Sequence, residues 1–149
     1  MWYVQQALHQ LEVAVRSVEQ VMDQILQSDL DRHHSLRKLL VHLVQIPSAD
    51  CLILNEATEE AMKHYYQKNQ PTTKVEMQRM LRQGFEHLQQ HFQSYSEHEL
   101  QTKTMSHWGV CYSRFEWLLQ IVAHFYHHRG QMISLLKELP MHVDGRWFE

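Results

Sequence analysis

The sequence has few of the residues that interrupt regular structure. It contains 4 glycines and 3 prolines in 149 residues, which favours long helices and disfavours a fold of many short strands. Cysteine is also scarce, because Cys51 and Cys111 are the only two. Two cysteines do not make a disulfide scaffold, so an apolar core has to hold the fold together.

A basic surface and a long apolar run are missing as well. The formal net charge is -3 with histidine neutral, and lysine and arginine do not cluster, which disfavours a nucleic-acid binder. No stretch approaches the roughly 18 consecutive apolar residues of a membrane span. Met1 to Tyr3 lead directly into an amphipathic pattern, without the charged start and apolar run of a secretory signal. We therefore expect a cytoplasmic protein that binds neither nucleic acid nor membrane.

Four amphipathic segments make up most of the chain, whose 44% hydrophobic and 21% charged residues are ordinary for a globular protein. In the first segment, Trp2 to Leu26, apolar residues recur at steps of three and four, which is the period of a helix. Similar stripes predict helices at about 31–65, 73–97 and 114–139. We predict one domain over residues 1–149, an all-α, up-and-down four-helix bundle.

Local signals refine these boundaries. Asp31 is a candidate N-cap for the second helix, and Pro47 predicts a kink in it or two helices that meet there. Thr73 and Glu76 have the spacing of a capping box for the third helix. The stretch 96–113 is less regular, contains Gly109, and predicts a loop with an extended portion over one end of the bundle.

The most unusual feature is the number of histidines, 13 in all. His124 and His128 are one helical turn apart on the inward face of the last helix, so their rings can converge on one ion. His42 lies on the inward stripe of the second helix. Counted from the expected helix starts, His42 and His124 lie at equal depth, and these two helices run parallel in an up-and-down bundle. Three imidazoles would leave a tetrahedral ion one open position.

Plainer interpretations stay open for each of these residues. A single inward histidine is more often a hydrogen-bonded core residue, and the His-x-x-x-His spacing arises by chance in a histidine-rich chain. His87 and His91 have the same spacing, although a solvated position is expected for them. A ferritin-type di-iron site would need Glu-x-x-His on two helices, and no Glu stands three residues before a His. A thermolysin-type site would need a Glu directly after the first histidine, where Phe125 stands.

The stretch from His124 to Gln131, His-Phe-Tyr-His-His-Arg-Gly-Gln, resembles the His-x-x-x-His-Arg-Gly-Gln signature of the DinB/YfiT-like family of metal-dependent enzymes. His42, in Leu-Val-His-Leu-Val, matches the upstream histidine of that family. The resemblance covers nearly the whole chain. It implies a four-helix bundle, often a homodimer, in which His42, His124 and His128 bind a divalent ion such as nickel, zinc or iron. Arg129 and Gln131 would serve as orienting or packing residues, and Gly130 would allow two helices to approach closely.

The better understood members of the family are thiol-dependent transferases and isomerases. The resemblance therefore implies a small-molecule substrate and a low-molecular-weight thiol as partner, with hydrolysis as another possibility. A non-catalytic metal-binding or stress-related protein is the alternative, and a fourth protein ligand from the 96–113 stretch would favour it. No catalytic residue can be assigned. Candidates near the motif are Tyr112, Glu116, Tyr126 and His107 as acids or bases, Cys51 and Cys111 as thiols, and Trp108 and Trp117 as cavity walls.

Overall fold

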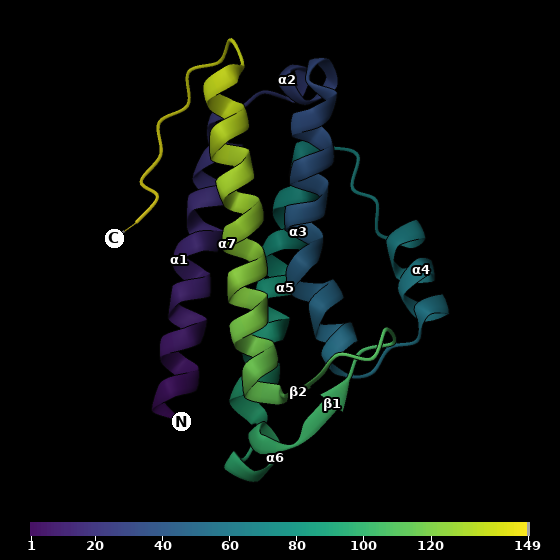
Figure 1. Cartoon of the computed structure of the whole chain (residues 1–149). Helices are drawn as coiled ribbons and strands as arrows, with labels where there is room; N and C mark the ends of the chain where they lie inside the picture. Colours follow the sequence, from purple (N-terminus) through teal and green to yellow (C-terminus); the bar gives the residue numbers. More distant parts are fainter. Residues whose placement is uncertain (149) are drawn as a thin grey trace.

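Four long helices dominate the computed structural model, which describes residues 1–148 (Figure 1). They are α1 (Trp2–Gln24), α3 (His34–Leu54), α5 (Lys74–Ser94) and α7 (Arg114–Glu138). The shorter helices are α2 (Gln27–Arg32), α4 (Glu59–Lys68) and α6 (Glu97–Gln101). A small antiparallel hairpin of β1 (Lys103–Met105) and β2 (Cys111–Ser113) precedes α7. The protein is therefore mostly helical, as the scarcity of glycine and proline predicts.

The apolar stripes of the four long helices meet in one core. Each helix contributes fully buried side chains to it, among them Leu11, Leu40, Phe85 and Phe125. Burial of an aliphatic or aromatic side chain of this size contributes about 1.5–3 kcal/mol to folding, so this shared core is the main source of stability. In the described part of the chain, no helix is both long and apolar enough to cross a membrane.

The direction of the helices differs from the predicted up-and-down order. The side chain of Gln78 donates to Asp23 and that of Arg82 to Glu19, so α5 runs antiparallel to α1. Tyr126 of α7 donates to the Gln10 carbonyl of α1, and Arg129, which is further along α7, donates to Ser17, which is further along α1. Helix α7 therefore runs parallel to α1. Contacts of Ser48 with Gly84 and of Asn55 with His91 show that α3 and α5 are parallel. The order is up, down, down, up.

The segment between α3 and α5 explains this topology. The predicted helix 31–65 ends at Leu54, and a turn at 55–58 separates it from α4. Glu56 has a φ of 64°, a left-handed conformation that a helix does not tolerate, and Thr58 caps α4 by accepting a hydrogen bond from the Ala61 N–H. Helix α3 is about 30 Å long. The crossover through α4 brings the chain back to the end of the bundle where α3 began, so α5 runs in the same direction as α3 (Figure 1).

Two details predicted for the second helix were wrong. Pro47 lies inside α3, which continues through it as one helix, so two helices do not meet there; the predicted kink stays a prediction. Packing of α3 against both α5 and α7 outweighs the backbone hydrogen bond that proline removes. Asp31 is not an N-cap; it lies in α2, and its carboxylate binds Arg37 instead. The Thr73–Glu76 capping box is confirmed at the start of α5.

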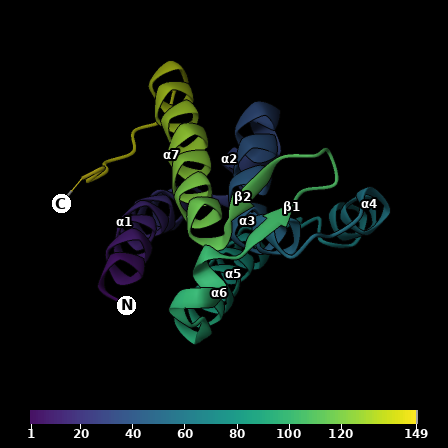
Figure 2. The ribbon, with the colours of Figure 1, turned by 60° about the horizontal axis from the view of Figure 1, so that its bottom comes forward.

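The hairpin at 103–113 covers one end of the bundle beside α4. Figure 2 shows it reaching from the start of α7 toward α4. The Met105 N–H donates to the Glu56 carboxylate at 2.9 Å, which ties the hairpin to the turn between α3 and α4. The extended portion predicted for 96–113 is thus present, and α6 precedes it.

Candidate metal centre

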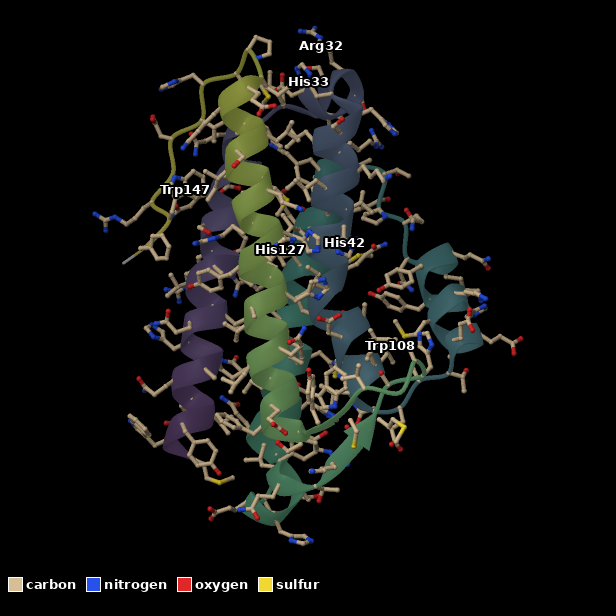
Figure 3. The ribbon with its side chains drawn as sticks, viewed as in Figure 1. Arg32, His33, His42, Trp108, His127 and Trp147 are labelled. Atoms are coloured by element: carbon tan, nitrogen blue, oxygen red, sulfur yellow. The ribbon has the colours of Figure 1, made fainter. Side chains whose placement is uncertain are left out.

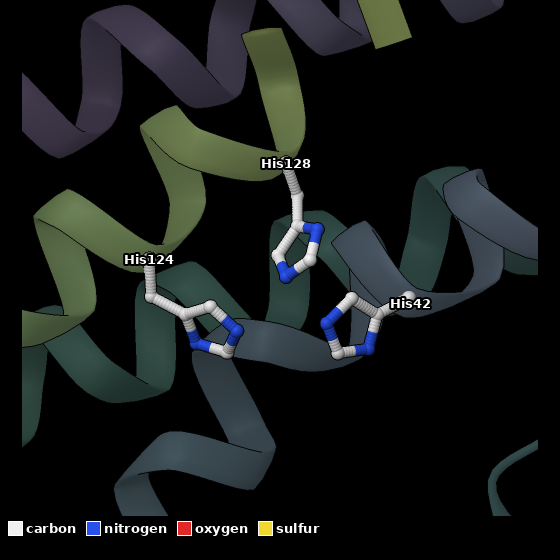
Figure 4. Close-up of side chains that lie close together, drawn as sticks. All are labelled: His42, His124 and His128. Atoms are coloured by element: carbon white, nitrogen blue, oxygen red, sulfur yellow. The ribbon is translucent and has the colours of Figure 1, made fainter. Parts of the chain in front are cut away.

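Three histidine rings converge between α3 and α7. His42 comes from α3, and His124 and His128 come from successive turns of α7 (Figure 4). One ring nitrogen from each residue lies within 4.8 Å of the others, and the ring centroids are 4.3 to 5.5 Å apart. All three side chains are partly buried. We call this group the three-histidine cluster; its donor set and spacing could hold one divalent ion.

The cluster forms for a different reason from the one predicted. Equal depth from the helix starts would bring His42 and His124 together only if the second and fourth long helices ran parallel, whereas α3 and α7 are antiparallel. His42 lies in the first half of α3 and meets His128 in the second half of α7, with 4.3 Å between ring centroids. Towards the other end of α3, Asp50 meets His124. The residues are brought together as expected, but through an antiparallel crossing.

Asp50 orients His124. The Asp50 carboxylate lies 2.7 Å from His124 Nδ1, and Asp50 is buried in α3. This hydrogen bond raises the pKa of His124, outweighing the effect of burial. With Nδ1 protonated and bound to Asp50, Nε2 is left as the free electron-pair donor. A carboxylate behind a ligating histidine is a recurrent support of metal sites, and Asp50 was not singled out from the sequence.

Gln131 supports His128 in the same way. Its side-chain Oε1 lies 2.8 Å from His128 Nδ1, and its Nε2 lies 3.3 Å from the ring of His127. His128 therefore also presents Nε2 when Nδ1 carries the proton. His127 itself is exposed, as its position on the helix predicts. Gln131 thus orients a cluster histidine, in line with the role that the family resemblance implied.

The electrostatics of the cluster favour neutral rings at two of its three positions. Burial, with the nearby His128 and His124, lowers the pKa of His42 to about 4. Burial also lowers the pKa of His128, against the opposing effect of Gln131. A metal ligand must be a neutral imidazole, so these two histidines need not lose a proton before binding an ion at neutral pH. The donor type and orientation of all three histidines, and the charge state of His42 and His128, fit a metal ion.

A cavity of about 330 Å³ opens directly beside the cluster and shares His124 with it. Its other walls come from α3, α4, the hairpin and α7, and Figure 3 shows Trp108 on the hairpin, beside α4. Trp117 also lines it, so both tryptophans considered as cavity walls have that position. The contribution of α4 was not predicted, because Met62 was assigned to a continuous second helix that ended at about Tyr65.

The other candidate residues separate into two groups. His107 lines the cavity, whereas Glu116 caps α7 with Ser113 and the hydroxyl of Tyr126 donates to the Gln10 carbonyl in α1. Tyr112 packs its ring on Trp117. Cys51 is buried, and burial raises the pKa of its thiol to about 11, whereas Cys111 is exposed in β2. Neither cysteine lines the cavity.

His87 and His91 do not join a group of metal donors within residues 1–148. The Nε2 atom of His91 lies 3.0 Å from Asn55 Nδ2 and 2.6 Å from the hydroxyl of Tyr95. His87 is exposed on α5 and stacks on His91 with the ring centroids 6.2 Å apart. His87 therefore has the solvated position expected for the pair, whereas His91 is partly buried.

Arg129 and Gly130 of the signature stand outside the cluster. Arg129 is buried, and its guanidinium donates to the Ser17 hydroxyl and to the Trp147 carbonyl, which attaches the C-terminal tail to the bundle. This is the packing role expected for it. Gly130 is exposed, and a Cβ placed on it would meet no atom within 4 Å. The expected close helix approach at Gly130 was therefore wrong.

Comparisons with known proteins agree with the fold and with the motif. The family model described as the DinB family matches residues 3–149. The chain is similar to the crystal structure of a protein from Exiguobacterium sibiricum 255-15 assigned to the DinB family, with a TM-score of 0.83, 26% sequence identity and 97% of each chain covered. No curated protein matches the sequence. The family match over nearly the whole length identifies the chain as a member of the DinB family.

Proposed function

We propose that this protein is a divalent-metal-dependent enzyme that acts on a small molecule, with His42, His124 and His128 as the metal ligands. Nickel, zinc or iron is the expected ion, as the family resemblance implies. The observation that carries the proposal is the three-histidine cluster, supported from behind by Asp50 and Gln131 and adjoining a cavity. Supported ligands next to a cavity are typical of a reactive site rather than of a purely structural one.

The donor count supports an open coordination position. Within residues 1–148 no fourth His, Cys, Asp or Glu belongs to the group that could share an ion. His107, from the stretch that could have supplied a fourth ligand, lines the cavity but is not part of the group. A divalent ion held by three imidazoles supplies a Lewis acid with room for one exogenous ligand.

The cavity favours chemistry between bound reactants over chemistry on a protein nucleophile. In the part of the chain that the structure describes, no Ser, Cys or Lys lines it. This agrees with a reaction in which a low-molecular-weight thiol is the attacking group, so we favour thiol transfer or addition, with hydrolysis second. His107 and Tyr66 line the cavity and are the side chains placed to exchange a proton with a bound molecule.

One observation favours the alternative, a non-catalytic metal-binding or stress-related protein. Among residues 1–148 the only carboxylate lining the cavity is that of Asp50, which is bound to His124 and is not free to act as a general base. A protein that only holds an ion needs no such base. Activity therefore decides between the two functions.

The decisive experiment measures turnover by the metal-loaded protein. Cysteine, glutathione and mercaptoethanol would be offered with an electrophilic aryl chloride, and nitrophenyl esters would test hydrolysis. We expect turnover by the wild type, loss of it in His42→Ala, and no change in the matched variant His87→Ala. Turnover that persists in His42→Ala would place the reaction elsewhere. Full metal occupancy without turnover of any substrate would favour the non-catalytic alternative.

We also propose that the protein forms a homodimer. Trp2 is 74% exposed at the start of α1 and Leu119 is 48% exposed on α7. Tyr3 follows Trp2, and Phe115 lies one helical turn before Leu119. The rings of Tyr3 and Phe115 are in contact, so Trp2 and Leu119 lie on neighbouring, parallel helices. Light scattering coupled to size exclusion would give a mass of about twice the 18.0 kDa of the chain, and a monomer mass would reject the proposal.

A further inference from the structure

The cavity beside the three-histidine cluster has a distinctive lining. Its apolar and aromatic walls come from four elements: Ile53 of α3, Met62 of α4, Trp108 of the hairpin and Trp117 of α7. No lysine or arginine among the described residues contributes to the lining, and the carboxylate of Asp50 is hydrogen-bonded to His124. The remaining polar groups of the lining are Tyr66, Gln120 and His107.

From this lining we infer that the cavity holds an uncharged, flat, apolar part of the substrate, while any carboxylate of the substrate or thiol stays outside it. The inference rests on the proposed function in one respect, because the reacting end of the molecule is taken to lie at His124, which the cavity and the cluster share. It narrows the substrate class from any small molecule to aromatic or compact aliphatic compounds.

The charges that line the cavity disfavour an anionic occupant. A carboxylate or phosphate enclosed by these walls would lose its hydration without meeting a lysine or arginine side chain, and it would face the Asp50 carboxylate. The cost of burying an unpaired charge is large, whereas an aromatic ring gains by leaving water. Burial and the neighbouring Asp50 carboxylate raise the pKa of Tyr66 to about 12, so its hydroxyl stays a neutral donor for an uncharged polar substituent.

The hairpin tip that carries Trp108 is held by several hydrogen bonds. Trp108 stands next to Gly109, whose φ of 93° makes the tight turn at the hairpin tip. The tip is closed by hydrogen bonds from the Gly109 N–H to the Ser106 carbonyl and from the Val110 N–H to the Ser106 hydroxyl. With Met105 also held by Glu56, the backbone that carries Trp108 is anchored, and its indole lines the cavity although Trp108 is 54% exposed. A preformed aromatic wall of this kind favours a flat ligand.

The volume of the cavity limits the size of its occupant. At about 330 Å³ the cavity is at the small end of ligand-binding sites, with room for one ring and its substituents. A larger, charged thiol such as a tripeptide would have to extend into solvent. The thiol and the apolar substrate would then approach the cluster from different sides.

A pair of metal-binding probes tests the inference. Protein loaded with Co²⁺ would be titrated with imidazole, phenylimidazole and the carboxylated analogue of phenylimidazole, with the visible absorption of Co²⁺ as readout. We expect phenylimidazole to bind at least roughly tenfold more tightly than imidazole, because its ring enters the cavity. The carboxylated analogue should lose this advantage.

Three variants make the test specific. Trp108→Ala should reduce the preference for phenylimidazole several-fold while leaving Co²⁺ content and imidazole affinity unchanged. Gln120→Lys, an exposed position on the cavity wall, should restore binding of the carboxylated analogue. Trp2→Ala removes an exposed tryptophan that does not line the cavity, and it should change neither Co²⁺ content nor the affinity for these probes.

The outcomes separate this inference from the proposed function. Equal affinity of imidazole and phenylimidazole, with Co²⁺ bound, would overturn the cavity assignment and leave the metal site intact. If Co²⁺ does not bind, the proposed function fails, and the cavity is tested in metal-free protein by quenching of tryptophan fluorescence with phenylimidazole. Saturable quenching that Trp108→Ala weakens and Trp2→Ala does not would still support the cavity; its absence would reject it.

Discussion

Asp50 is the residue whose role the sequence concealed most. It lies two turns beyond His42 on α3 and reaches across to His124 on α7. A single Asp next to an apolar stripe has no motif of its own, and its partner is distant in sequence. The histidines could be predicted because their spacing and the family signature are local. Their supporting groups could not, except for Gln131, which belongs to the signature.

We predict that Asp50→Asn lowers metal affinity by about tenfold to a hundredfold and leaves the fold intact. The amide keeps the size of the side chain but not the negative charge that fixes the His124 tautomer and raises its basicity. Competitive titration with a metal chelator would measure the change. Asp144→Asn, at a site where the carboxylate is 86% exposed, is the control. Unaltered affinity in Asp50→Asn would show that Asp50 does not support a ligand.

At the scale of elements, three of the four long helices could be predicted closely. Helices α1, α5 and α7 end within a few residues of the expected positions because their apolar periodicity is continuous, and the start of α5 is marked by a capping box. The break between α3 and α4 was missed, since the helical pattern continues on either side of it. The Thr58 cap, followed by Glu59 and Glu60 in the first turn, was the available signal.

Packing of α3 on α5 depends on Gly84. A Cβ at this position would lie 2.7 Å from the Ser48 hydroxyl oxygen and 3.4 Å from Pro47 Cβ. We predict that Gly84→Ala destabilises the protein by about 1 kcal/mol, because crowding outweighs the gain in helix propensity. In a Ser48→Ala background the same change should become neutral or stabilising. Chemical denaturation of the four variants measures this coupling.

Gly130→Ala is the matched control for the Gly84 and Ser48 substitutions. Gly130 is an exposed helical glycine with open space around it, so alanine there should stabilise by up to about 1 kcal/mol. Additive effects of the Gly84 and Ser48 substitutions would contradict the proposed close approach of α3 and α5.

The capping boxes make stability depend on acid pH. Hydrogen bonds from the backbone and side chains of the caps lower the pKa values of Glu76, Glu99 and Glu116 in the folded protein. A carboxyl group with a lowered folded pKa contributes stability above its unfolded pKa and loses it as the pH falls through the folded value. We therefore predict a loss of stability between about pH 5 and pH 3.

Glu116→Gln tests this prediction, because glutamine keeps the capping geometry without the charge. Its denaturation midpoint should fall less than that of the wild type on acidification. Glu60→Gln, at an exposed position of α4, should behave like the wild type. Identical pH profiles for wild type and Glu116→Gln would contradict the contribution of the cap.

At the scale of the whole molecule, the helix direction was the part that sequence patterns could not give. Apolar stripes show which face of a helix is buried but not which way the helix runs beside its neighbours. The crossover through α4 decides this by returning the chain along the bundle before α5 starts. The three-histidine cluster was nevertheless predicted by residue, because inward faces of adjacent helices can meet in either direction.

Metal content tests the central claim most directly. Elemental analysis of the untagged protein, incubated with nickel, zinc or iron at neutral pH, should show about one equivalent of one metal for the single cluster. His42→Ala should lose it and stay folded, because the apolar core does not include His42. His87→Ala should retain it. No bound metal in the wild type, or equal metal in His42→Ala, would contradict the account and leave the chain with the DinB fold alone.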